Sequence, residues 1–551
     1  MRTRFATRTL LFVSLALAGA VSAQAASAAT PSTRANVSAL KDSGHYDRFI
    51  ITYSSGSLQH SDRAVMMRDI DGAVRRAGLD KAKIAGSGQA LGAVQASFQR
   101  RLAIGSDLVR TSRKLDRNEA AALMSQIAAD PSVLDVTPDV MMYRDPLIKA
   151  PDLFQPAAFT PNDTYYPFYQ WHLKAPDGAI TYFGDANLGG ANVSGAWDIA
   201  DGSNVVIAVL DTGITQHVDV DTSLADAGYD FISDAFVSGR PTDDRVPGGW
   251  DLGDWTTTEP WLSACTSPSR PPESSSWHGT HVASTAGAEL TNNARGMAGI
   301  AYNAKVLPVR VLGHCGGYTS DIADAIVWAA GGHIDGVPDN QYPADVINLS
   351  LGGGGTCRTY DPTGWAVHVA NQLGAVVVVS AGNSNDDARN YSPASCPGVI
   401  TVAATGVTGK RAYYSNYGMA VEIAAPGGGV YQDDDPATGV VSYDGFVWQA
   451  LNNGSTTPVA LGTSYSGYAG TSQAAPHVAG TVALMQSARK ALGLRPLKPL
   501  QVLAILRKTA MRPSFSLRDN HHYIGAGIVD AQAAVEASIN GTRNGAGGVV
   551  Q

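Results

Sequence analysis

A serine at the start of a helical segment is the first residue of this chain whose position could support chemistry. Ser472 follows Gly470 and Thr471, and the small apolar residues from Ala474 to Met485 predict a buried helix. Free N–H groups and the helix dipole favour an anion at such a position. Serine before a helix is commonly an N-cap, so the position alone favours a cap. A nucleophilic role requires a base, an orienting acid and an oxyanion donor elsewhere in the chain.

Three polar side chains upstream could supply these groups. Asp211 follows the apolar run at 205–210, and Asn383 closes a second run at 376–379. His278 stands at the mouth of a helical segment, beside a glycine. An orienting carboxylate, an imidazole that takes the serine proton and an amide that donates to an oxyanion together make a nucleophilic acyl-transfer site. Each residue alone also has an ordinary explanation, because Asp and Asn are common in turns and caps.

The elements that would position these residues alternate between apolar strands and helices. The predicted strands are 205–210, 306–312, 346–351, 376–379 and 399–403, and the helices between them are 278–290, 319–330 and 365–373. Continuous β-branched runs are typical of parallel strands covered on both faces. We therefore predict an α/β fold with a doubly wound, mostly parallel sheet, helices on both faces, and a site at the carboxyl ends of the strands. Residues 438–465 predict a β-hairpin, and helices over 499–510 and 530–537 complete the chain.

An export signal and a small α+β unit precede this sheet. Basic residues followed by the apolar run at 10–18 predict a signal peptide over 1–29, cleaved after a residue in the range Ala23 to Ala29. Residues 45–143 alternate between strand and helix patterns, and 146–161 predicts an exposed linker. A cleavable propeptide and an ordinary stable domain both fit this unit. The predicted divisions are the signal peptide at 1–29, the N-terminal unit with a linker from about 146 at 30–157, and the main domain at 158–551.

Charge is distributed unevenly along the chain. The formal net charge of −8 combines a net positive segment at 1–157 with a net negative remainder. An acidic main domain argues against nucleic acid or an anionic membrane as partner. It also suggests that the basic N-terminal unit docks onto the acidic remainder. After signal removal, no run is long enough to cross a bilayer, so we expect a secreted, extracellular protein.

The cysteine count fits an exported protein. The four cysteines are Cys265, Cys315, Cys357 and Cys396. An even number in an exported chain predicts two disulfide bonds, with three possible connectivities. Because the spacing contains no CxxC pair, a zinc site is not expected.

Five strings in a fixed order resemble the subtilisin-like serine proteases, or subtilases: VLDTGI, HGTHVAS, INLSLGGG, VVVVSAGN and GTSQAAPHVAG. The similarity covers about 165–540. It implies a secreted serine endopeptidase in which Ser472 is the nucleophile, His278 the general base and then acid, and Asp211 the group that orients His278. Asn383 and the backbone N–H of Ser472 would form the oxyanion hole.

The resemblance also implies the walls that hold a protein or peptide substrate. They are Ser350, Leu351, Gly352 and Gly353 from one segment, and Ser380, Ala381 and Gly382 from another. The first segment would pair with the extended substrate backbone, and both would line the pocket for the side chain before the scissile bond. Because no acid lies in these walls, we expect broad cleavage after apolar or large neutral residues, with Tyr391 able to narrow the pocket.

The N-terminal unit acquires a role from the same resemblance. It would be a small ferredoxin-like α+β propeptide that acts as an intramolecular chaperone and temporary inhibitor, removed autocatalytically from a monomeric enzyme without an organic cofactor. The disulfide bonds implied are Cys357–Cys396, bracing the specificity pocket, and Cys265–Cys315, tying an acidic insertion to the central sheet.

Structural calcium is a further implication of the resemblance. Asp219 and Asn293 match calcium-binding positions, and the acidic loop with Asp243 and Asp251 is a weaker candidate, for which solvated surface carboxylates are nearly as good an interpretation. Hard oxygen ligands from such loops are what Ca²⁺ takes.

Two residues depart from the usual family pattern. Ser284 stands where the family has glycine, and Gln473 stands where the family has methionine directly after the nucleophile. A methionine there could be oxidised beside the site. The sequence therefore predicts resistance to inactivation by peroxide.

Two other functions compete with a broad-specificity protease. A narrow processing protease would have paired acids in its substrate pockets, and the sequence does not show them clearly. A catalytically inactive binding protein on the same fold would lack a triad or oxyanion residue, and none is missing.

Overall fold

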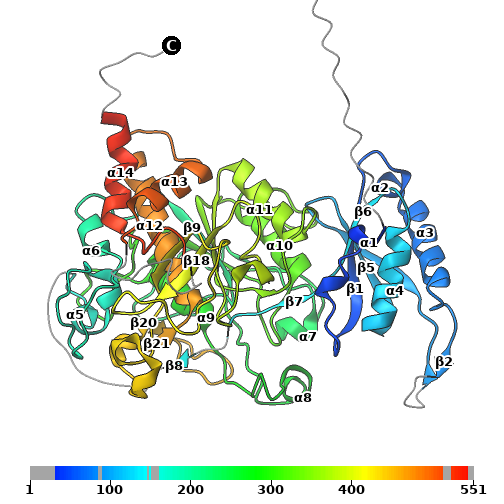
Figure 1. The fold of residues 1–551 in the computed structure, drawn as a ribbon, viewed down its shortest axis with the longest axis horizontal. Coiled ribbons are helices and arrows are strands. Elements are labelled where there is room, and N and C mark those ends of the chain that lie inside the picture. The colour runs from blue at the N-terminus through cyan, green and yellow to red at the C-terminus, as the bar shows by residue number, and fades with distance from the viewer. Residues whose placement is uncertain (1–30, 85–89, 146–147, 150–160, 513–522, 544–551) are drawn as a thin grey trace, which may run out of the picture.

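Two bodies of unequal size make up the computed structural model, which describes residues 31–84, 90–145, 148–149, 161–512 and 523–543 (Figure 1). The predicted signal peptide and the greater part of the linker lie outside the described residues. The smaller body spans the blue and cyan part of the chain at the right of Figure 1. No helix among the described residues has the length and apolar character needed to cross a membrane.

The small domain has a four-stranded antiparallel sheet in the order β4-β5-β1-β6. Its elements follow the chain as β1 (His45–Tyr53), α2 (Leu58–Ser61), α3 (Arg63–Arg76), β4 (Ala96–Arg101), β5 (Asp107–Asp116), α4 (Arg117–Ala128) and β6 (Val133–Pro138), with a short hairpin of β2 (Lys83–Ile84) and β3 (Ala90–Leu91). Apart from that hairpin and α2, this is the β-α-β-β-α-β order of ferredoxin-like units. Apolar residues of β1, α3 and α4 form one core, including Ile51, Ile70 and Leu123.

The large domain is built on an eight-stranded sheet in the order β11-β10-β12-β9-β14-β16-β18-β19. The strands are β9 (Val206–Asp211), β10 (Tyr229–Asp230), β11 (Val246–Pro247), β12 (Lys305–Arg310), β14 (Val346–Leu349), β16 (Val376–Ser380), β18 (Ile400–Thr405) and β19 (Ile423–Pro426). All neighbouring pairs are parallel except β10 with β11. The predicted doubly wound, mostly parallel α/β sheet is confirmed.

Alternate residues of each central strand enter different cores, as the predicted two-sided burial requires. In β16, Val376 and Val378 belong to one core and Val377 and Val379 to the other. The first core also includes α9 (His278–Ala283), α12 (Thr471–Ala491), α13 (Pro499–Thr509) and α14 (Ala531–Arg543). The second lies under α10 (Thr319–Ala329) and α11 (Pro362–Leu373). Helices therefore cover both faces of the sheet.

Two expectations about the elements differ from the structure. The segment predicted as one helix over 278–290 is α9 followed by a π-helical turn at Ser284–Ala288 that contains a kink at Gly287. The sequence predicts 133–136 together with 140–143 as the last strand of the small sheet; the first part is β6, which ends at Pro138, and residues 140–143 leave that sheet. They enter the large domain instead, because their backbone groups find strand partners there.

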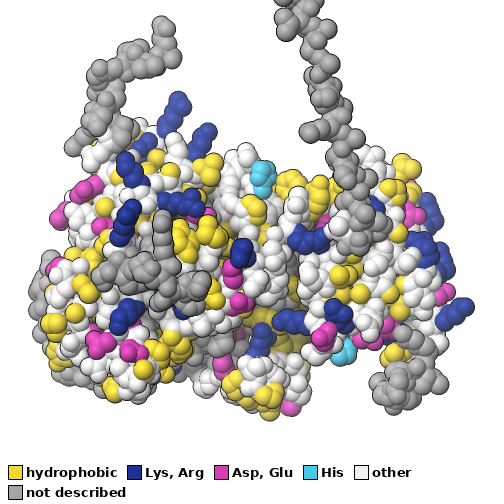
Figure 2. Space-filling model, in the orientation of Figure 1, with side chains coloured by type: hydrophobic (Ala, Val, Ile, Leu, Met, Phe, Trp, Pro, Cys, Tyr) yellow, Lys and Arg dark blue, Asp and Glu magenta, His cyan; other side chains and the backbone are white. Residues whose placement is uncertain are grey.

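The two domains meet through charged contacts on α10. Arg100 of the small domain lies 2.9 Å from Asp321 and 3.2 Å from Asp324, and Arg245 of the large domain contacts the same two carboxylates. Asp139 accepts the backbone N–H of Ser320 at 2.9 Å, in the first turn of α10. Other basic side chains lie on the outer face of α3, at the right edge of Figure 2. Specific ion pairs thus join the basic small domain to the acidic large domain.

Candidate active site

The ends of β9, α9 and α12 bring the three predicted triad residues to the carboxyl edge of the sheet. Asp211 is the last residue of β9, His278 the first of α9 and Ser472 the second of α12. Nδ1 of His278 lies 2.8 Å from Oδ1 of Asp211, and both side chains are fully buried. Gly279 permits this contact, because a Cβ there would lie 2.2 Å from the backbone oxygen of Gly213.

Ser472 lies on a helix that packs against α9, but its hydroxyl points elsewhere. Oγ of Ser472 donates to the backbone oxygen of Ser350 at 3.2 Å, and Oγ of Ser350 donates back to the oxygen of Ser472 at 2.8 Å. Nε2 of His278 is buried and has no hydrogen-bond partner among the described residues. Catalytic hydrogen bonds in unliganded enzymes are often formed only when substrate binds.

The amide of Asn383 is oriented by Thr471. Its Oδ1 accepts the Thr471 backbone N–H at 2.9 Å and the Thr471 hydroxyl at 2.8 Å. Because the oxygen is used in this way, the NH₂ group is left to donate. Gly470 leaves room for it, since a Cβ there would lie 3.0 Å from Nδ2 of Asn383. The arrangement suits a donor to a developing oxyanion.

The chain that leaves the small domain crosses this site as an extended strand. In β7 (Met141–Met142), Met142 pairs antiparallel with Gly317 and Met141 with Tyr318, which form β13. Tyr143 then exchanges two backbone hydrogen bonds of 2.8 Å with Gly352, one of the predicted substrate walls. The segment therefore binds between two edges of the large domain, as an added strand would.

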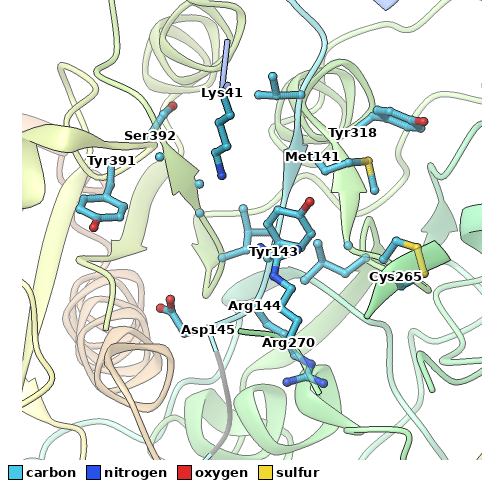
Figure 3. A pocket seen from close by; sticks show the side chains of 18 of the residues that line it. Lys41, Met141, Tyr143, Arg144, Asp145, Cys265, Arg270, Tyr318, Tyr391 and Ser392 are labelled. Atoms are coloured by element: carbon cyan, nitrogen blue, oxygen red, sulfur yellow. A yellow bond between two sulfur atoms is a disulfide. The ribbon is translucent and has the colours of Figure 1, made fainter. Parts of the chain in front are cut away.

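Arg144 and Asp145 continue this strand through a cavity of about 670 Å³ (Figure 3). The carboxylate of Asp145 lies close to the backbone N–H of Asn383 and to His278. Burial raises the pKa of Asp145 to about 6, against the opposing effects of His278 and the Asn383 N–H. Beyond the site, β8 (Ile148–Lys149) pairs with β21 (Ser464–Ala469), which itself forms the predicted hairpin with β20 (Val447–Leu451).

The predicted substrate walls border the same cavity. Its lining includes Leu351, Gly352, Gly353, Ser380, Ala381 and Gly382. Ser350 is instead fully buried beneath Ser472. Tyr391 also lines the cavity and lies at the left of Figure 3, whereas Arg144 and Arg270 lie near the middle of the view. The structure thus brings six of the seven wall residues to the linker strand and places the seventh against the predicted nucleophile.

Comparison with known proteins gives the family. Residues 202–543 match the family described as "Subtilase family". The chain belongs to the subtilase family. It is 43% identical over 496 residues to the "Extracellular protease" of Xanthomonas campestris pv. campestris, covering 90% of this chain and 73% of that one. It is 39% identical over 529 residues to the "Extracellular basic protease" of Dichelobacter nodosus, covering 96% and 76%.

Solved structures agree with this assignment. A protease structure from Pseudoalteromonas arctica aligns with a TM-score of 0.59 and 44% identity, covering 69% of this chain and all of that one. Fervidolysin from Fervidobacterium pennivorans aligns with a TM-score of 0.55 over 90% of this chain and 62% of that one; at 22% identity it shows the fold alone. This subtilase is accordingly a serine protease hydrolase.

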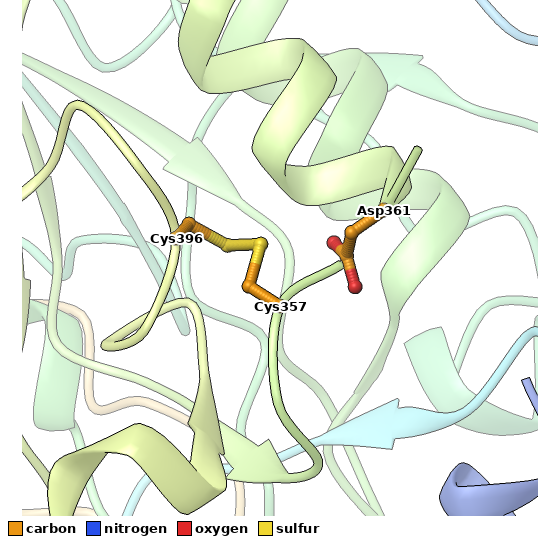
Figure 4. A group of neighbouring side chains, drawn as sticks. All are labelled: Cys357, Asp361 and Cys396. Carbon is orange, nitrogen blue, oxygen red and sulfur yellow. A yellow bond between two sulfur atoms is a disulfide. The ribbon is translucent and has the colours of Figure 1, made fainter. Parts of the chain in front are cut away.

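Both disulfide bonds of this subtilase border the cavity or its walls. Cys265–Cys315 joins α8 (Trp261–Cys265) to the loop after β12, and both its cysteines line the cavity. Cys357–Cys396 joins the segment before α11 to the loop that follows Tyr391. Asp361 lies beside this second bond (Figure 4). Because both sulfurs are in a covalent bond, they offer no thiolate to a metal, and Asp361 serves instead as the N-cap of α11.

Asp219, one predicted calcium ligand, lies beside a second buried carboxylate. Asn293 donates to Asp219, and Tyr465 donates to the same side chain at 2.9 Å. Burial raises the pKa of Asp219 to about 6, and burial together with Asp219 raises the pKa of Glu289 well above its usual range. Oε1 of Glu289 has no partner in the described part of the chain. These adjacent oxygen donors fit a hard cation such as Ca²⁺.

The weaker calcium candidate does not form a single site. Asp243 is exposed and accepts the backbone N–H of Ala235, whereas Asp251 is buried and accepts the hydroxyl of Thr212 at 2.6 Å. Over the described ranges, the acidic side chains of this loop do not meet in a cluster of three that could share one ion. The two carboxylates have different partners: Asp251 lies beside the segment that follows Asp211, where its backbone N–H donates to the oxygen of Ile214, and Asp243 lies beside Ala235.

The sequence did not predict the site residues that lie in the linker, that contact it, or that lie at the start of the large domain. Asp163 accepts the backbone N–H groups of Asn292 and Asn293 and so fixes the loop beside Asp219. Arg144 reaches Asp254 and Glu273. These residues lack a motif of their own. The signal that could have found Arg144 is an isolated basic residue in an extended segment leading into an acidic domain.

Proposed function

We propose that this subtilase is a secreted, calcium-stabilised serine endopeptidase that is made as an autoprocessed zymogen. The observation that carries the proposal is the state of His278. Its Nδ1 is held by Asp211, its Nε2 is unpartnered among the described residues, and a peptide strand crosses directly in front of it. A base held in one tautomer beside an extended peptide is what peptide-bond hydrolysis requires.

Acylation begins when the Ser472 hydroxyl leaves the oxygen of Ser350 and donates to Nε2 of His278. Oγ attacks the substrate carbonyl while His278 takes the proton, and Asp211 stabilises the imidazolium that forms. The oxyanion is bound by Nδ2–H of Asn383 and the backbone N–H of Ser472. Collapse of the intermediate breaks the C–N bond, and His278 returns its proton to the leaving amine.

Deacylation repeats these steps with water. His278 removes a proton from water, the hydroxide attacks the acyl carbon, and the same donors stabilise the second oxyanion. Proton return to Oγ of Ser472 releases the acid product. The two predicted wall segments, at 350–353 and 380–382, carry no acid, which supports broad cleavage after apolar or large neutral residues.

In the precursor, residues 30–157 would act as an intramolecular chaperone and inhibitor. The paired backbones of Tyr143 and Gly352 support inhibition, because they occupy the strand position that a substrate needs. The ion pairs of Arg100 on α10 support docking. Autocatalytic cleavage in the linker from about 146 would release a monomeric extracellular enzyme.

Calcium would be held by Asp219 and Glu289, with the amide oxygen of Asn293 after rotation of its side chain. Bound calcium would supply two positive charges that stabilise the folded state. Its removal by a chelator is expected to lower the melting temperature of the Ser472→Ala precursor. In Asp219→Asn the chelator should no longer lower the melting temperature. In Asp243→Asn, a change in the acidic loop that forms no single site, the chelator should still lower it.

The direct test of the proposed function is Ser472→Ala in the full chain. We expect the purified variant neither to shorten itself nor to digest casein, while Ser487→Ala, a buried serine in the same helix, does both. If Ser472→Ala still removes its own residues up to the 146–161 linker and digests casein, Ser472 is not the nucleophile.

A further inference from the structure

The side chain of Arg144 lies between two carboxylates of the large domain. Its Nε is 3.0 Å from Oδ2 of Asp254, and its Nη2 is 2.8 Å from Oε2 of Glu273. The Arg144 side chain is 13% exposed, that of Asp254 6% and that of Glu273 39%. Each carboxylate thus contacts a different nitrogen of one guanidinium, as in charge-assisted recognition.

The two acids are held in place by the large domain itself. Asp254 accepts the backbone N–H of Ser276 at 2.6 Å and the Ser276 hydroxyl at 2.8 Å. The Glu273 backbone is paired with Thr256, through bonds of 2.8 and 3.0 Å. Although burial opposes it, the Arg144 charge and the Ser276 bonds hold the pKa of Asp254 below its usual range. The contacts with Ser276 and Thr256 come from the large domain and not from the linker, so the acids should stay in place when the linker leaves.

The backbone register fixes which residue of a peptide meets these acids. Tyr143 is paired with Gly352, and Asp145 contacts the Asn383 N–H near His278. Arg144 is therefore the residue directly before the one at the reacting position. A substrate strand bound in the same register would place its second residue on the acyl side of the scissile bond between Asp254 and Glu273.

We propose that Asp254 and Glu273 form an acidic subsite that selects protein and peptide substrates with arginine one residue before the cleaved residue. The inference rests on the proposed protease function and deepens it. It also supplies the paired acids that the sequence did not show clearly. A guanidinium should be preferred over lysine, because its planar fork presents two separate nitrogens to the two carboxylates, whereas lysine offers a single ammonium nitrogen.

The charges around the subsite favour a cation there. A third carboxyl group, Asp251, lies close to Asp254; burial and the charge of Asp254 raise its pKa to about 7, so the negative charge of the subsite comes chiefly from Asp254 and Glu273. The nearby guanidinium of Arg310 is already bound to Asp230 at 2.8 Å. Once Arg144 departs, the subsite keeps a negative excess that an arginine of the substrate would neutralise.

The test uses the mature enzyme and a series of fluorogenic peptides that share one large neutral residue before the scissile bond. The preceding residue is Arg, Lys, Ala or Glu. We expect kcat/KM to be about tenfold or more higher for Arg than for Ala, with Lys between them and Glu lowest. Glu273→Gln should lose most of the preference for the Arg peptide over the Ala peptide. Glu536→Gln, on the remote helix α14, should keep the wild-type ratio.

The outcomes separate this subsite from the proposed function. Equal kcat/KM for the Arg and Ala peptides with the wild-type enzyme overturns the subsite while leaving the protease intact. An unchanged Arg preference in Glu273→Gln also overturns it. Hydrolysis of none of the peptides by the wild-type enzyme contradicts the protease proposal itself. The wild-type comparison needs no variant, so a folding defect in Glu273→Gln does not remove the test.

Discussion

At the scale of single residues, the site depends on which oxygen or nitrogen is already occupied. Asp211 uses Oδ1 to hold His278 and also accepts the Thr212 backbone N–H at 2.8 Å. Asn383 has its oxygen engaged by Thr471, which leaves its NH₂ to donate. Gln473 is buried next to Ser472, and neither end of its amide has a partner within the described ranges. The chemistry is thus set by these local hydrogen bonds.

Asp211→Asn should separate orientation from folding. An amide can occupy the same volume, but it cannot stabilise an imidazolium and it favours the wrong tautomer. We expect kcat to fall by roughly 10⁴-fold with little change in KM. Steady-state kinetics with the Ala peptide would measure kcat and KM. Asp71→Asn, an exposed substitution on α3, is the matched control for the yield of folded precursor. A fall of less than tenfold would show that Asp211 does not orient the base.

Peroxide sensitivity should follow the residue after the nucleophile. The amide of Gln473 has no sulfur to oxidise, so the wild-type enzyme should retain its activity after peroxide treatment. Gln473→Met should lose activity under the same treatment. Casein hydrolysis after peroxide treatment would measure the residual activity of the wild type and of the variant. Rapid loss of wild-type activity, at peroxide doses that spare a control hydrolase, would contradict this prediction.

At the scale of elements, the linker strand is the piece that closes the cleft. It is held by backbone pairing on one side of the reacting position and by β8 on the other. Such pairing depends on N–H and carbonyl groups, so it does not depend on the linker's side chains. The side chains add selectivity, as Arg144 does between Asp254 and Glu273.

Tyr143→Pro should loosen this strand. Proline has no N–H, so the bond from Tyr143 to the oxygen of Gly352 is lost. We expect freshly purified precursor of this variant to hydrolyse a peptide substrate several-fold faster than wild-type precursor before any cleavage is visible. Tyr143→Phe keeps the N–H and serves as control. Equal initial rates for the proline and phenylalanine variants would show that the strand does not inhibit.

At the scale of the whole molecule, carboxylates are buried where the two domains meet. Asp135 of the small domain lies 3.4 Å from Arg358 of the large domain, and Asp361 is nearby. Burial raises the pKa of Asp135 to about 7, with Arg358 opposing the shift and Asp361 adding to it. The pKa of Asp361 is raised to about 6, again chiefly by burial.

These shifts predict that docking weakens as pH rises. A released Asp135 has its ordinary pKa near 4, so the docked state binds the proton more tightly and docking is favoured at low pH. The advantage is lost as pH increases from about 4 to about 7. Binding of a fluorescent peptide to the Ser472→Ala precursor should therefore strengthen between pH 5 and 7.5, as the cleft opens. Asp135→Asn should flatten this dependence and Asp71→Asn should not; an unchanged slope in Asp135→Asn would contradict it.

The sequence predicted the parts of this molecule that depend on local pattern. The apolar runs before Asp211 and Asn383 predicted two strands, β9 and β16, and both residues lie at the predicted edge of the sheet. Local sequence patterns could not predict the contacts between segments that are distant in the chain. Arg144 meets Asp254 and Glu273 across 110 and 129 residues, and no periodicity links them. The prediction that 140–143 continues the last strand of the small sheet was wrong for the same reason, since the partners of this segment lie in the large domain.

The most direct test of the central claim is covalent labelling of the mature enzyme with a fluorophosphonate, followed by peptide mass spectrometry. An activated serine forms a stable phosphonyl ester, whereas ordinary serines do not react. We predict one modification, on Ser472, with activity lost in proportion to labelling and no labelling in His278→Ala. Labelling at another serine, or full activity loss with Ser472 unmodified, would contradict the account.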